Sequence, residues 1–230
     1  MLTGKEFVQK LTQDNEGLFR SSELMVKAYF DSKPSQDELV EHFIGRMVNE
    51  RMNMVGVAKA VANADVNTDP EELTLLSKQV LDEAIHFKLV KEVIEHITGK
   101  EVDVDAAIAA EQAKPTAKGA SLLSKYGQLD DVVLSTYQLL AEGRAERNWD
   151  MMANCIEDSF ISGRYAKIAR DEGFHATIGA RKLEKLCGDI ATQDRVLSLA
   201  KQMRQDLYEV CCANSMPTEE AKSIFESAYA

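Results

Sequence analysis

Apolar residues recur every three or four positions along most of the chain, and this spacing predicts helices. Capping residues, glycines and prolines divide the sequence into separate helical segments. One short helix is predicted after Thr3 and another after Pro217. Between them, helices are predicted at about 22–31, 35–63, 70–98, 130–155, 159–186 and 190–213. No alternating stretch is long enough to predict a sheet. The chain is therefore predicted to be all-α.

The segment of about 100–120 contains small, polar and breaker residues and is predicted to be the main connection. A bundle of two antiparallel helix pairs needs such a crossover between its halves. We predict a single domain over residues 1–230, with four core helices at about 36–187 and additional N- and C-terminal helices.

Acidic residues interrupt the apolar stripes of three predicted helices. Glu50 fills the step between Met47 and Met54, and Glu83 fills a gap in the stripe of the next helix. Glu172 shares a stripe with Ile168 in the same way. A buried, unpaired carboxylate costs roughly several kcal/mol. Several such groups on core faces therefore favour a bound cation.

Two DExxH segments, at 82–86 and 171–175, carry the most specific pattern in the sequence. Glu and His three residues apart project from the same helix face and can reach one metal ion. A dinuclear site in a four-helix bundle takes a Glu-x-x-His from each of two helices and one Glu from each of the others. Glu50 and Glu142 are the predicted single glutamates, and Glu146 is an alternative or extra ligand.

The spacing of these glutamates fits two helical hairpins. Glu50 and Glu83 stand 33 positions apart, and Glu142 and Glu172 stand 30 apart. Two helical arms joined by a tight turn fit each interval, because a helix rises ~1.5 Å per residue. Each pair of carboxylates is therefore predicted to lie at one height in its hairpin. Glu146 gives a less even match.

The segment ARDEGFH at 169–175 resembles the iron-binding helix of the radical-generating small subunit of class I ribonucleotide reductase. The paired motif also resembles the bacterial multicomponent monooxygenases and the wider ferritin-like di-iron oxidases. The resemblance covers about 36–187 and implies a ferritin-like four-helix bundle. Val90 stands where the reductase subunit usually has its radical-storing tyrosine, so we do not expect that role.

The resemblance implies two iron ions, although manganese–iron or dimanganese centres suit the same ligands. It divides the predicted metal ligands into two groups: Glu50, Glu83 and His86 for one ion, and Glu142, Glu172 and His175 for the other. Asp171 is expected to hydrogen-bond the imidazole of His86, and Asp82 that of His175, which would fix the ring orientations.

The activity implied by the resemblance is that of a non-haem di-iron oxidase or oxygenase. Such an enzyme activates O2 to oxidise a small organic substrate and draws on an external electron donor. The alternative is an iron-handling or peroxide-reducing protein like ferritins and rubrerythrins, although the four cysteines form no CxxC pair for a rubredoxin-type module. A third interpretation is a helical scaffold whose site is vestigial or holds zinc.

Composition narrows the range of partners. The 230 residues are 45% hydrophobic and 28% charged, with a net charge of −11, which opposes binding to nucleic acid or anionic membranes. No apolar run reaches the ~18–20 residues that span a bilayer, and we see no secretory signal. We therefore expect a cytoplasmic protein, with a homodimer as a possible arrangement.

Overall fold

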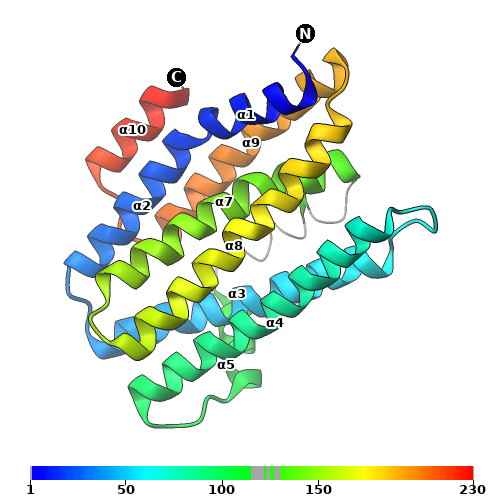
Figure 1. The fold of residues 1–230 in the computed structure, drawn as a ribbon. Helices are drawn as coiled ribbons and strands as arrows, with labels where there is room; N and C mark the ends of the chain where they lie inside the picture. Colours follow the sequence, from blue (N-terminus) through cyan, green and yellow to red (C-terminus); the bar gives the residue numbers. More distant parts are fainter. Residues whose placement is uncertain (1, 115–121, 123–124, 127–129, 230) are drawn as a thin grey trace. The chain divides into compact units, whose positions relative to one another are not determined.

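The computed structural model describes residues 2–114, 122, 125–126 and 130–229 (Figure 1). Helices dominate these residues, and they contain no β-strand. The predicted all-α class is therefore confirmed. No helix in these ranges is long and apolar enough to cross a lipid bilayer.

The chain divides into two compact units, which are described separately. The first unit contains residues 1–32 and 129–230, and the second contains residues 33–128. The predicted single domain over 1–230 stays a prediction.

The second unit is built on a long helical hairpin. It includes α3 (Gln36–Ala62), α4 (Pro70–Thr98) and α5 (Val104–Ala113). Helices α3 and α4 pack together along their length, and α5 packs against α3. The Nε2 atom of Gln36 donates a hydrogen bond to the carbonyl of Ile97 at 2.9 Å. The start of α3 therefore lies beside the end of α4, as an antiparallel pair requires.

Local signals set the ends of this hairpin at the predicted places. Ser35 and Glu38 form a capping box at the start of α3. Asp69 caps α4, with Pro70 at the first helical position. Gly99 ends α4 with a φ of 65°, a backbone conformation that glycine adopts without steric cost.

The first unit contains helices from both ends of the chain. Its helices are α1 (Gly4–Asp14), α2 (Glu16–Asp31), α7 (Asp131–Cys155), α8 (Ser159–Leu186), α9 (Ile190–Asn214) and α10 (Glu219–Tyr229). Helix α7 packs against α8, α2 and α9, while α10 packs on α2 and α1 packs on α8. Additional helices therefore precede and follow the predicted core segment.

Helices α7 and α8 approach each other closely because glycine stands at their contact. A Cβ atom at Gly179 would lie 2.5 Å from the carbonyl oxygen of Ser135 and 2.9 Å from Cβ of Gln138. A side chain at this position would push the helices apart. The close packing brings the polar residues of the two helices within reach of one another.

One helix boundary and one additional helix differ from the prediction. Helix α2 begins at Glu16 instead of about 22, because Leu18 and Phe19 are buried and tertiary packing extends the helix. Helix α5 lies inside the predicted connection, where the Asp103 side chain caps it at Ala106. The part of that connection at 115–121 lies outside the described residues.

Candidate metal centre

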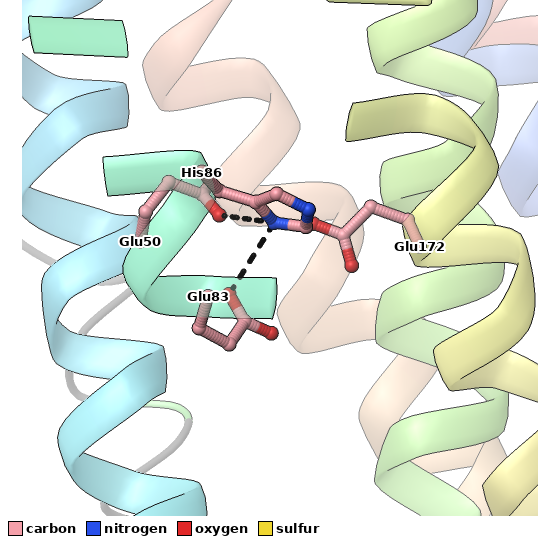
Figure 2. A group of neighbouring side chains, drawn as sticks. All are labelled: Glu50, Glu83, His86 and Glu172. Atoms are coloured by element: carbon pink, nitrogen blue, oxygen red, sulfur yellow. Dashed lines mark ion pairs between the residues drawn. The ribbon is translucent and has the colours of Figure 1, made fainter. Parts of the chain in front are cut away.

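One group of predicted ligands meets inside the second unit. Glu50 of α3 and Glu83 and His86 of α4 each offer a ligand atom, and these atoms lie within 4.8 Å of one another. The Nδ1 atom of His86 lies 3.4 Å from Oε2 of Glu50 and 3.7 Å from Oε2 of Glu83. Dashed lines in Figure 2 mark these two ion pairs. We call these three residues the α3/α4 set.

The α3/α4 set is buried. The exposed fractions are 2% for Glu50 and 0% for both Glu83 and His86. The three-residue spacing of Glu83 and His86 places both on one face of α4. The antiparallel hairpin supplies Glu50 from the facing helix. The structure thus brings together the three side chains that the sequence paired, and their role as metal ligands stays a prediction.

The other group of predicted ligands meets inside the first unit. Glu142 of α7 and Glu172 and His175 of α8 also offer ligand atoms within 4.8 Å of one another. Their exposed fractions are 7%, 1% and 0%. The Nδ1 atom of His175 lies 2.9 Å from Oε2 of Glu172. We call these three residues the α7/α8 set, and their role as ligands likewise stays a prediction.

Glu146 lies near the α7/α8 set but outside its group of close ligand atoms. A Cβ atom at Gly173 would lie 3.0 Å from Oε1 of Glu146, so this carboxylate rests against α8 beside Glu172. Burial raises the pKa of Glu146 above its ordinary value. The geometry favours Glu142 over Glu146, and an extra ligand role for Glu146 stays a prediction.

The aspartates that precede Glu83 and Glu172 pair with lysines one turn earlier. Asp82 pairs with Lys78, and Asp171 pairs with Lys167. Asp82 is buried, with 6% exposed. The hydrogen bonds that the imidazoles of His86 and His175 are expected to donate to Asp171 and Asp82 stay a prediction.

The donor atoms fit a divalent metal ion. Each set combines two carboxylates and one imidazole in a buried place, and oxygen and nitrogen donors of this kind suit iron, manganese and zinc. Oε2 of Glu50 is buried and has no hydrogen-bond partner among the described residues. A buried carboxylate oxygen without a donor is costly, and a cation would remove that cost. A single dinuclear centre formed by both sets stays a prediction.

Comparisons with known proteins identify a fold and no family. No protein-family model matches the chain, and no curated protein matches it. A solved structure of a TenA homolog from Pseudomonas syringae pv. tomato matches with a TM-score of 0.68. The match covers 90% of this chain and 92% of that one at 12% sequence identity. At this identity the likeness establishes the fold alone.

The TenA-like match corrects the resemblance suggested by the sequence. The TenA homolog has a different all-helical fold from the ferritin-like bundle, so the assignment to the ferritin-like di-iron superfamily is wrong. The predicted di-iron oxidase or oxygenase activity rested on that assignment and is wrong with it, as is the ferritin- or rubrerythrin-like alternative. The DExxH spacing specifies which side chains share one helix face, and it does not specify how the helices connect.

Other expectations are untouched by these findings. Iron or manganese as the bound ion, a small-molecule partner, O2, an electron donor, a homodimer and a cytoplasmic location all stay predictions. So does the expectation that the protein binds neither nucleic acid nor membranes.

Proposed function

We propose that this protein is a metal-dependent enzyme with a TenA-like helical fold, in which each ligand set binds one divalent transition-metal ion. The observation that carries the proposal is the convergence of three buried ligand atoms within 4.8 Å in each set. Iron and manganese are the proposed ions, and both accept mixed carboxylate and imidazole ligands, as zinc also does.

The electrostatics of the α3/α4 set support metal binding. Glu50 and Glu83 place two carboxylates beside one imidazole in a site that is closed to solvent. Carboxylates that share a buried site repel each other, and each loses its hydration. A divalent cation offsets both costs. The same reasoning applies to Glu142 and Glu172 in the α7/α8 set.

The type of ligand in each set supports an enzyme. Carboxylate and imidazole ligands together hold catalytic metal ions in many enzymes. A bound ion of this kind supplies Lewis acidity and an activated water molecule. The chain's own residues hold the ion and exclude bulk water, and we propose a small molecule as the substrate.

Metal titration tests the proposal. Metal-free protein is titrated with Mn²⁺, the unbound ion is followed by its electron paramagnetic resonance signal, and bound metal is measured by mass spectrometry. We expect about two Mn²⁺ per chain, one for each set, and loss of about one ion in Glu83→Ala and in Glu172→Ala. The control variants remove carboxylates from the same two helices, Glu92→Ala on α4 and Glu184→Ala on α8, and should keep both ions. No binding by the wild-type protein, or unchanged binding by the ligand variants, would contradict the proposal.

A further inference from the structure

Each ligand set contains one glutamate that follows a buried glutamine by four residues. Gln79 precedes Glu83 on α4, and Gln138 precedes Glu142 on α7. The exposed fractions of the glutamines are 0% and 4%. Residues four apart lie on the same helix face, so each amide is placed one turn from a predicted metal ligand.

Packing alone does not require an amide at such a position. A buried amide is unfavourable unless it forms hydrogen bonds, whereas an aliphatic side chain fills the same space without that requirement. The residue four positions before Glu172 is Ile168, which is fully buried. An aliphatic residue is therefore accommodated at this position relative to a ligand glutamate, and the glutamines need another explanation.

Contacts of Gln79 supply that explanation in the α3/α4 set. Its Nε2 atom donates to Oε1 of Glu83 at 3.5 Å, at the long end for a hydrogen bond. The other oxygen of the same carboxylate, Oε2, is the one that lies 3.7 Å from Nδ1 of His86. The amide therefore engages one oxygen of Glu83 while the second oxygen faces the remaining ligands.

Gln138 is placed to act in the same way in the α7/α8 set. A Cβ atom at Gly179 would lie 2.9 Å from Cβ of Gln138, so this glutamine faces α8. Gly179 stands one turn after the ligand His175. The absence of a side chain at Gly179 lets Gln138 pack directly against α8.

We propose that Gln79 and Gln138 are positioning residues that orient Glu83 and Glu142 for metal binding, each through an amide N–H donated to one carboxylate oxygen. This inference rests on the proposed metal binding. Groups that hydrogen-bond a metal ligand fix its orientation, and their loss typically lowers metal affinity by about 10–100-fold.

The test compares leucine variants of the two glutamines with the wild-type protein. Mn²⁺ affinity is measured by titration, and stability is measured by urea unfolding of the metal-free protein. Gln79→Leu and Gln138→Leu should each weaken one Mn²⁺ site by about 10–100-fold while the metal-free protein keeps at least its original stability. A purely structural role would change stability and leave the affinity unchanged.

Gln193→Leu is the matched control. Gln193 is also buried, at 7% exposed, but it donates to the carbonyl oxygens of Leu2 and Cys187. Its replacement should lower stability and leave both Mn²⁺ affinities unchanged. Should Gln79→Leu fail to fold, the unbranched variant Gln79→Met provides the same comparison.

The outcomes separate this inference from the proposed function. Wild-type protein that binds no Mn²⁺ contradicts the proposed function itself. If the wild-type protein binds Mn²⁺ and the Gln79→Leu and Gln138→Leu variants bind it with the same affinity as the wild-type protein, only the positioning role is contradicted.

Discussion

The Nδ1 atom of His86 on α4 lies 3.4 Å from Oε2 of Glu50 on α3, although the two residues belong to different helices. The antiparallel hairpin brings them to one level, and both are buried. Glu83 joins them from the same helix as His86. A core optimised for stability alone would place apolar residues at these positions, so the cluster indicates a function.

Replacing Glu50 should separate stability from metal binding. In Glu50→Leu we expect the metal-free protein to be at least as stable as the wild-type protein, because an apolar side chain replaces a carboxylate that shares a buried site with Glu83. Mn²⁺ should stabilise the Glu50→Leu variant less than it stabilises the wild-type protein, because a ligand of one site is lost. Urea unfolding with and without Mn²⁺ measures both effects.

Glu41→Leu is the control for this prediction. Glu41 also lies on α3, but its side chain is 69% exposed and pairs with Lys114 at 3.1 Å. Glu41→Leu should change neither the stability of the metal-free protein nor its stabilisation by Mn²⁺ appreciably, since exposed ion pairs contribute little to stability. A less stable metal-free Glu50→Leu protein with intact stabilisation by Mn²⁺ would contradict the account.

The contact between α7 and α8 should be sensitive to the smallest added side chain. Gly179→Ala would place its Cβ atom 2.5 Å from the backbone oxygen of Ser135, so the helices must separate. We expect a loss of about 1–3 kcal/mol in free energy of unfolding and weaker Mn²⁺ binding by the α7/α8 set. Urea unfolding and Mn²⁺ titration measure the two effects.

Gly163 on the same helix provides the matched comparison. A Cβ atom there would meet nothing within 4 Å. Gly163→Ala should therefore stabilise the protein by up to about 1 kcal/mol, because alanine favours the helix. Equal stability of the two alanine variants would contradict the close approach of α7 and α8 at Gly179.

The pH dependence of stability should contain a contribution from His42. Burial, together with the charge of Arg46, lowers the pKa of His42 from 6.5 to about 3. Below pH 6.5 the unfolded chain therefore binds a proton at this residue that the folded chain does not bind until about pH 3. Stability falls over this window as the pH drops.

The variant His42→Asn should lose this part of the pH dependence. The drop in the urea midpoint between pH 7 and pH 4.5 should be smaller in the variant than in the wild-type protein. An equal drop in both proteins would show that His42 is protonated in the folded state at pH 4.5.

Local features of the fold were predictable from the sequence because short-range chemistry determines them. The capping residues Ser35 and Asp69 and the terminating Gly99 lie where the helices begin and end. The helical period placed Glu50 and Glu83 on inner faces, and both are buried. The start of α2 was missed because its first turn is stabilised by distant contacts of residues such as Leu18.

The arrangement of the helices was not predictable in the same way. Spacing within a helix places Glu172 beside His175, and hairpin length places Glu142 on the facing helix, so the membership of each ligand set followed from the sequence. Neither feature distinguishes a ferritin-like bundle from another all-helical fold, because an antiparallel helical hairpin can occur in either. The positioning glutamines were overlooked, although Gln-x-x-x-Glu occurs at 79–83 and at 138–142.

The most direct test of metal binding is a crystal structure of the protein loaded with Mn²⁺, with diffraction data collected on both sides of the manganese absorption edge. We expect an anomalous difference peak in each ligand set, about 2.0–2.3 Å from carboxylate oxygens of Glu50 and Glu83 and from those of Glu142 and Glu172. Crystals soaked in saturating Mn²⁺ that show no anomalous peak at either set would contradict the proposed metal binding.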